Sequence, residues 1–200
     1  MSGFQTIFEI QQKMTVANRR TIGQQVSRSG ELRVAQYLTT VPWVFTVTPH
    51  NYLYYPQVRD IIQTIDNLDR QLPQNITFQS DNLKWFTAMQ GTATSATVAT
   101  TATANTQVIT LSSNGTYKAG DFIQIGGYVY KVTADSSGAT VYINRPLIGL
   151  QPSGTNVIMG NNVQFNVIAQ TCPTYTLNPM KDGAFVQWDS DFVFRENIAI

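Results

Sequence analysis

The sequence of 200 residues predicts a mainly β protein, a β-sandwich or barrel, with one long α-helix at about residues 56–71 and an inserted small β-barrel module. Three observations lead to this prediction. Apolar and polar residues alternate in several short runs, turn residues recur between these runs at intervals of about 8–12 residues, and one segment instead has helical periodicity.

The first strands are expected before residue 50. Residues 6–14 fit either a strand or a helix, whereas residues 22–28 favour a strand that turns near Gly30 into a second one. Residues 43–48 alternate as Trp-Val-Phe-Thr-Val-Thr between Pro42 and Pro49. Because proline has no amide hydrogen for a ladder bond, these two prolines mark the ends of that strand.

The helical segment begins at Pro56, which suits the first position of a helix, and ends before Pro73. The apolar residues that share one face are Val58, Ile61, Ile62, Ile65, Leu68 and Leu72. Its acidic residues Asp60, Asp66 and Asp69 fall on the opposite face. We interpret them as a solvated surface, because they lack the spacing of a calcium-binding loop.

Residues 76–78 and 83–89 return to strand-like composition, and a Thr/Ala tract follows over residues 91–106. The side chains of this tract are too small to fill a core, which predicts either a flexible connector or an edge strand. We expect its start to be the entry into a second structural unit.

Residues 120–132 predict a β-hairpin. Two arms of alternating apolar residues flank Gly126 and Gly127, which can supply the positive φ angles that a two-residue turn needs. Further short strands are expected at 108–111, 140–143 and 157–159, and the longer runs at 163–168, 185–188 and 192–195 complete the chain.

The distribution of these strands predicts a discontinuous organisation. Residues 1–90 and 163–200 would form the main β-domain with its helix, and residues 91–162 would form the inserted module. Neither flank alone holds enough strands for a closed sheet, although two consecutive domains are the alternative.

Composition limits the functional classes. Charged residues make up 12% of the chain, about half the usual share of ~25%, and the formal net charge is +1. This balance disfavours nucleic acid or an anionic membrane as the main partner. Low charge suits extensive packing against copies or partners, but it also fits an ordinary neutral β protein, so both readings stay open.

No segment resembles a secretory signal or a membrane helix, which predicts a chain made in the cytoplasm and not inserted into a membrane. Cys172 and His50 are each the only residue of their type. They offer no disulfide framework, no thiolate metal cluster and no triad, so we expect no metal, no cofactor and no catalytic residue.

Two weak leads point to carbohydrate. Asp189 and Asp191 lie two residues apart between Trp188 and Phe192, as acids and aromatics do in glycosidases, but a polar turn between two strands explains them as well. Tyr128 and Tyr130 share one hairpin face and could stack on sugars, although cross-strand packing explains aromatic residues in strands more often. A carbohydrate-binding or fibre-attachment module is therefore the alternative function, and an enzyme is not expected.

A pattern found in tail proteins of tailed bacteriophages resembles residues 118–133, which read Lys-Ala-Gly-Asp-Phe-Ile-Gln-Ile-Gly-Gly-Tyr-Val-Tyr-Lys-Val-Thr. In that pattern a Gly-Asp pair opens a strand, an Ile-Gly hairpin follows and a Tyr-x-Val strand returns. Residues 144–147 (Asn-Arg-Pro-Leu) and 192–196 (Phe-Val-Phe-Arg-Glu) fit the same pattern. The front half is similar in layout to the tail-tube fold shared by tube, distal tail and baseplate hub proteins.

The resemblance implies a structural protein of the virion tail. Members of this family form a ring, commonly hexameric, that links the tail tube to the baseplate or tip. Their partners are the tube, the hub or tip and other baseplate proteins, and DNA only passes through the channel. The resemblance implies no active site. We expect the chain to pair its sheet edges with neighbouring copies.

Overall fold

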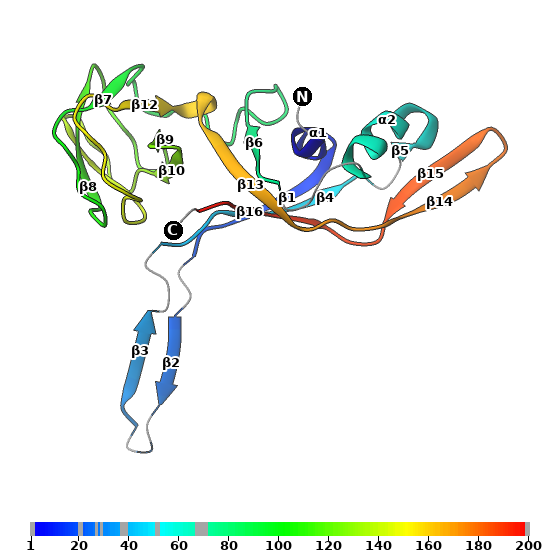
Figure 1. The fold of residues 1–200 in the computed structure, drawn as a ribbon, viewed down its shortest axis with the longest axis horizontal. Helices are drawn as coiled ribbons and strands as arrows, with labels where there is room; N and C mark the ends of the chain where they lie inside the picture. The colour runs from blue at the N-terminus through cyan, green and yellow to red at the C-terminus, as the bar shows by residue number, and fades with distance from the viewer. Residues whose placement is uncertain are drawn as a thin grey trace.

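The computed structural model describes residues 3–19, 22–26, 28, 30–36, 40–50, 53–66 and 72–198, and it is mainly β (Figure 1). The helical elements are α1 (Gly3–Glu9), α2 (Tyr55–Asp66) and a 3₁₀ turn, η1 (Gly160–Asn162). The strands are β1 (Gln11–Ala17), β2 (Ile22–Val26), β3 (Leu32–Gln36), β4 (Val44–Pro49), β5 (Leu53–Tyr54), β6 (Gln74–Thr77), β7 (Ala96–Val98), β8 (Val108–Ser113), β9 (Phe122–Ile125), β10 (Tyr128–Lys131), β11 (Thr140–Tyr142), β12 (Asn156–Met159), β13 (Gln164–Thr171), β14 (Tyr175–Met180), β15 (Gly183–Trp188) and β16 (Phe192–Glu196).

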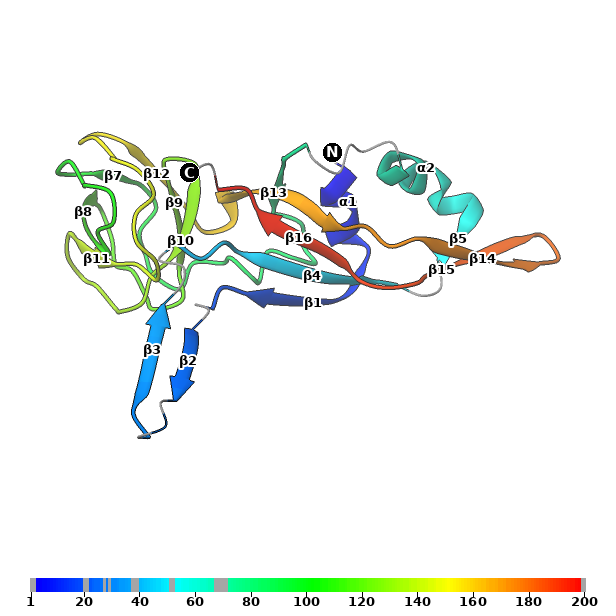
Figure 2. The ribbon, with the colours of Figure 1, turned by 60° about the horizontal axis from the view of Figure 1, so that its bottom comes forward.

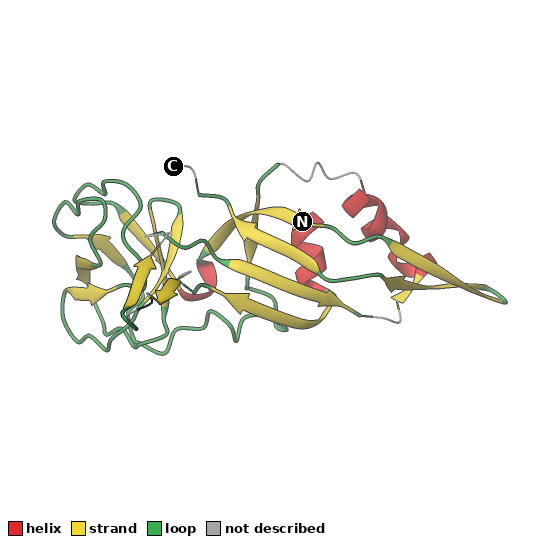
Figure 3. Cartoon of the chain, turned by 90° about the horizontal axis from the view of Figure 1, so that it is seen from below, coloured by secondary structure: helices red, strands yellow, loops and turns green. Residues whose placement is uncertain are grey.

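The strands form four antiparallel sheets, of which the larger two are curled in the manner of half-barrels. The main sheet has the order β1-β4-β16-β13-β6, and a six-stranded sheet has the order β10-β9-β12-β7-β8-β11. Two smaller sheets have the orders β14-β15-β5 and β2-β3. The main sheet lies between the six-stranded sheet and the β14–β15 hairpin (Figure 3).

An aromatic core holds the main sheet against the helices. Phe4 and Phe8 of α1 are completely buried. The centroid of the Phe8 ring lies 5.7 Å from the ring centroid of Phe45 on β4 and 5.1 Å from that of Phe194 on β16. Most of these ring pairs are tilted or edge-to-face, which aromatic quadrupoles favour over a flat sandwich. Both helices therefore lie on one side of the main sheet, as Figure 1 shows.

A second core fills the six-stranded sheet and corrects the interpretation of the Thr/Ala tract. The tract contributes β7, which lies between β12 and β8 in the interior of the sheet and is neither a connector nor an edge strand. Ala93, Ala96 and Ala102 are at most 8% exposed. Small residues are accommodated here because the sheet curls tightly and larger side chains such as Tyr117, also fully buried, fill the remaining space.

The predicted β9–β10 hairpin is confirmed. Tyr128 pairs with Ile125 across a two-residue turn, and Gly126 and Gly127 have φ angles of 60° and 89°. Positive φ at both central positions is the signature of the turn that matches the twist of a hairpin.

The two cores meet through this hairpin. Phe122 of β9 and Val129 of β10 belong to the main aromatic core, although their strands hydrogen-bond within the six-stranded sheet. The Phe122 ring lies 5.6 Å from Trp43. The limits of the inserted module, residues 91–162, therefore stay a prediction.

Two hairpins project from this body. β2–β3 extends to the side opposite the helices, and β14–β15 extends beyond the end of the main sheet (Figures 1 and 2). β15 is anchored by pairing with the short β5, whereas β14 is the outer strand. Its last five residues, Thr176–Met180, are all exposed.

The expectation of one long helix at residues 56–71 is wrong. The helix α2 is twelve residues long and ends at Asp66. Val58 packs on the main core and Ile62 is 2% exposed, so this part of the predicted apolar face is buried. Leu72, by contrast, lies beyond the helix and is exposed. Leu68 and Asp69 fall outside the described residues.

Two further expectations are corrected or resolved. Residues 83–89 form no strand: consecutive turns cover residues 81–87, where the amide of Lys84 donates to the carbonyl of Ser80 at 2.8 Å, and residues 88–89 are irregular. Residues 6–14 contain both alternatives, because α1 ends at Glu9 and β1 starts at Gln11.

Candidate functional site

The most elaborate polar arrangement joins the six-stranded sheet to the main sheet. Arg145 and Glu196 form an ion pair with Nη1–Oε2 and Nη2–Oε1 distances of 2.6 Å, and their side chains are 1% and 2% exposed. The guanidinium also donates to the carbonyls of Val41 at 2.9 Å and Val129 at 2.8 Å. Such a two-pronged pair fixes direction as well as distance.

Trp43 completes this cluster, which we call the joint. Its amide donates to Glu196 Oε2 at 3.0 Å, and its indole nitrogen donates to the Val129 carbonyl at 2.9 Å. Tyr130 lies under the guanidinium, 5.1 Å from the Arg145 carbon to the ring centroid, and its hydroxyl accepts the amide of Ile148 at 2.9 Å. Burial raises the pKa of Tyr130 to about 12. These contacts engage both carboxylate oxygens and both terminal nitrogens of the guanidinium, while the buried Arg145 Nε has no partner among the described residues. The bonds all lie within the chain, which indicates a structural role for the joint.

A second buried carboxylate, Asp121, fixes the entry into the six-stranded sheet. Its side chain is 1% exposed and accepts three backbone amides: Gln90 at 2.7 Å, Gly91 at 3.0 Å and Lys118 at 2.8 Å. Both carboxylate oxygens accept from the backbone of the chain itself. Asp121 therefore ties the incoming segment to the β9–β10 hairpin.

The two tyrosines predicted to share a sugar-binding face differ in how far they are buried. Tyr130 is 0% exposed and is engaged by Arg145, so it cannot stack on a sugar, whereas Tyr128 is only partly buried. Cross-strand and core packing is thus the role of Tyr130.

Asp189 and Asp191 occupy the turn between β15 and β16. Asp189 is exposed and accepts the hydroxyls of Thr174 and Thr176, and its amide donates to the Thr174 carbonyl at 3.0 Å. The neighbouring Trp188 is buried against Phe192 and Tyr175, which leaves no open aromatic face there. The turn interpretation accounts for these contacts.

Cys172 is partly buried, lies outside any disulfide and packs against the main core. Within the described part of the chain, no three His, Cys, Asp or Glu side chains are grouped in a way that could hold a metal ion. The described residues also include no helix of the length and apolarity that a membrane span requires.

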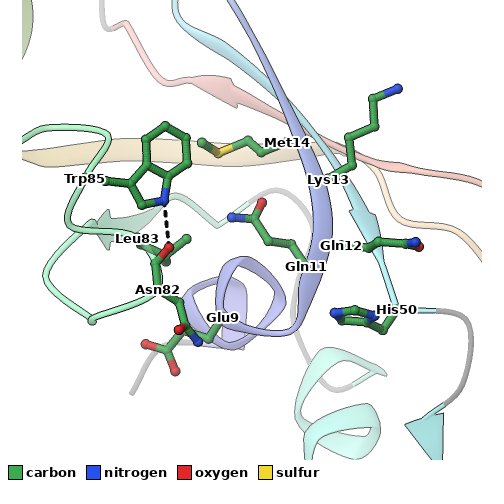
Figure 4. Close-up of a pocket in the computed structure, with 9 residues that line it drawn as sticks. All are labelled: Glu9, Gln11, Gln12, Lys13, Met14, His50, Asn82, Leu83 and Trp85. Carbon is green, nitrogen blue, oxygen red and sulfur yellow. Dashed lines mark hydrogen bonds between the residues drawn. The ribbon is translucent and has the colours of Figure 1, made fainter.

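His50 lies at a polar pocket of about 430 Å³ beside the start of β1 (Figure 4). The pocket is lined by Glu9, Gln11, Gln12, Lys13, Met14, His50, Asn82, Leu83 and Trp85. Trp85 is 65% exposed, the second highest value among the large apolar side chains that lie exposed in the described part of the chain. No motif in the sequence indicates this pocket, because its residues come from three separate segments and are individually of common types.

The exposed apolar residues of the described chain concentrate away from the two cores. Those on or beside the hairpins are Val26 at the end of β2 and Leu177 and Met180 on β14. Val108 and Tyr142, each 47% exposed, face one another across β8 and β11 at the edge of the six-stranded sheet. These surfaces, together with the outer strand β1 of the main sheet, are open to a partner, whereas the outer strand β6 is bonded at Thr77 by the side chain of Gln5.

Comparison with protein-family models and with curated proteins finds no match to this chain.

Proposed function

We propose that the chain is a structural subunit of a bacteriophage tail, placed in the ring that links the tail tube to the baseplate or tip. Its neighbours are further copies of itself and the tube, hub or tip proteins, and DNA crosses the ring only as passing cargo. The work of such a subunit is self-association and docking, without catalysis.

The single observation that carries the proposal is the pair of hairpins that extend away from the body. A sheet of two strands, such as β2–β3, is marginally stable alone in water, and an exposed outer strand, such as β14, invites pairing with other chains. On β14, Leu177 and Met180 expose apolar surface at 39% and 49%. A subunit that packs these hairpins against neighbours gains burial that the isolated chain lacks.

The composition of β14 suggests how the contact is made. Pro179 lies within this outer strand and removes one donor from its edge. We therefore assign the contact at β14 to packing of apolar side chains, with ladder pairing restricted to edges that keep their donors. The buried joint supports this use, because a hairpin can position a neighbour only if its own body is rigid.

Assembly of the purified chain tests the proposal. We expect light scattering after size-exclusion chromatography to report a closed oligomer as concentration rises or when the tail partner is added, and electron microscopy to show rings. Leu177→Lys with Met180→Lys should abolish assembly without lowering the urea midpoint. Thr100→Lys, an exposed change outside the hairpins, is the matched control.

A monomer at all concentrations, both alone and with tail-tube and baseplate proteins, would refute the proposal. Assembly that is unaffected by the two lysines would refute the assignment of β14 as a contact surface.

A further inference from the structure

We propose that the pocket beside β1 binds a neutral saccharide through the face of Trp85. This site is separate from the joint and from the projecting hairpins, and it does not depend on the proposed role in a tail. The pocket of about 430 Å³ falls in the size range of small-molecule sites, about 300–1,000 Å³.

Trp85 is held as a platform. Its indole nitrogen donates to the carbonyl of Asn82 at 2.8 Å, the dashed bond in Figure 4, and Phe86 meets its ring edge-to-face at 6.0 Å. With the nitrogen already bonded and one edge packed, the side chain stays 65% exposed in a fixed orientation. A fixed aromatic face loses little side-chain entropy when a ligand stacks on it.

The rest of the pocket supplies hydrogen-bonding groups. A bulge in β1 between Gln11 and Lys13 changes the direction of successive side chains, and Gln11 extends between Trp85 and His50 in Figure 4. The Gln11 Oε1 atom is buried and has no hydrogen-bond partner among the described residues. A buried acceptor without a donor is unfavourable, and a ligand hydroxyl can supply that donor.

Glu9 is positioned for the same ligand. The side chain of Gln5, on α1, donates to Glu9 Oε1 at 3.2 Å. It is held in turn by Thr77 of β6, whose backbone amide it accepts at 2.8 Å and to whose carbonyl it donates at 3.0 Å. The carboxylate is thereby oriented while Oε2 keeps its acceptor capacity. Glu9 and Lys13 carry opposite charges, so the pocket has no excess charge to select an ion.

A pyranose matches this combination of groups. One face of the ring presents C–H groups that suit an indole, and its rim carries hydroxyls that both donate and accept. An acidic ligand would meet Glu9, and a purely apolar ligand would leave the Gln11 and Asn82 groups unmatched. The chemistry of the pocket therefore selects a neutral sugar.

The test uses the full chain on an array of neutral glycans, followed by titration calorimetry with methyl glucoside, methyl galactoside and the best oligosaccharide from the array. We expect binding that quenches tryptophan fluorescence. Trp85→Ala should weaken it about tenfold or more, the scale of losing one aromatic stack. Gln11→Ala should also weaken it, whereas Tyr142→Ala, an exposed aromatic outside the pocket, should not.

The urea midpoint of each variant confirms that it remains folded. The proposal is overturned if no neutral glycan binds, if only acidic glycans bind, or if Trp85→Ala binds as well as the parent chain. If the parent chain binds no glycan and Trp85→Ala fails to assemble, Trp85 is instead a contact between subunits. A chain that binds glycans but forms no ring would refute the proposed function alone.

Discussion

Replacing Arg145 by methionine tests whether the joint holds the two sheets together. The change removes the guanidinium but keeps an unbranched side chain in its place. Glu196, with a side chain 2% exposed, then loses both of its 2.6 Å contacts. Of the described residues, only the Trp43 amide still donates to the carboxylate.

The size of the effect follows from which groups are left without a partner. The Val41 carbonyl still accepts the side-chain amide of Asn18 at 3.0 Å, and the Val129 carbonyl still accepts the indole N–H of Trp43 at 2.9 Å. Neither carbonyl is orphaned, so the penalty comes from the unpaired carboxylate. Breaking a buried pair from one side lowers the free energy of unfolding by about 3–5 kcal/mol.

The double variant Arg145→Met with Glu196→Leu separates pairing from packing. With both charges gone, the main unsatisfied group is the Trp43 amide, which costs about 1–3 kcal/mol. We therefore expect the double variant to be more stable than Arg145→Met alone. Urea unfolding followed by tryptophan fluorescence provides the measurement, because Trp43 lies in the joint.

The exposed pair Lys118–Asp135, at 2.7 Å, is the control, and Lys118→Met should shift the urea midpoint little. Equal shifts for Arg145→Met and Lys118→Met would refute the reasoning. The reasoning would also be refuted if the double variant lost as much free energy of unfolding as Arg145→Met and Glu196→Leu lose separately when their losses are added. Two separate unfolding transitions in Arg145→Met alone would show that the pair couples the cores.

Three further predictions concern the six-stranded sheet and its entry. Asp121→Ala removes a buried carboxylate that accepts three backbone amides and should lower the free energy of unfolding by about 3 kcal/mol in urea, because each bond to a charged acceptor contributes about 1.5–3 kcal/mol at most sites and these three are only partly buried, whereas the exposed Asp135→Asn should change the midpoint little. Gly127→Ala should cost about 1 kcal/mol for its positive φ alone. Gly126→Ala should cost more, because its added methyl would lie 2.3 Å from Nε2 of Gln151, a buried residue whose Nε2 donates to the Ile148 carbonyl; equal thermal midpoints would contradict this. Because the pKa of Tyr130 is raised from 10 to about 12 in the folded chain, the unfolded chain loses this proton first as pH rises. Stability should therefore fall between pH 10 and 12 by about 1.4 kcal/mol per pH unit relative to Tyr130→Phe, and parallel curves would refute the assignment.

Local patterns in the sequence were sufficient for much of the fold. The alternation at residues 43–48 and the glycine pair at 126–127 predicted β4 and the β9–β10 hairpin, because both depend on neighbouring residues only. The prediction was less accurate where tertiary packing decides. The Thr/Ala tract became the interior strand β7 because partners on both sides supply its hydrogen bonds, and no local pattern can indicate those partners.

The buried polar residues were also beyond sequence reasoning. Arg145 enters the sequence analysis only within the run at residues 144–147, and its partner Glu196 lies 51 residues away in the chain. Trp85 lies within an expected strand at residues 83–89, and it is an exposed platform because residues 81–87 form turns. In both cases the function of the side chain depends on which distant segment faces it.

The few charges of this chain have a distribution that bears on its role. Arg145, Glu196 and Asp121 are buried and bonded within the chain, so one of its 13 basic and two of its 12 acidic residues are withdrawn from the surface. Charged residues at an interface must be desolvated when a partner binds, so a surface depleted of them lowers the cost of association. Arg145 and Glu196 also connect the two sheets through the joint. A rigid body with a weakly charged surface and projecting hairpins is suited to repeated association, and this combination favours an assembly role over an isolated soluble one.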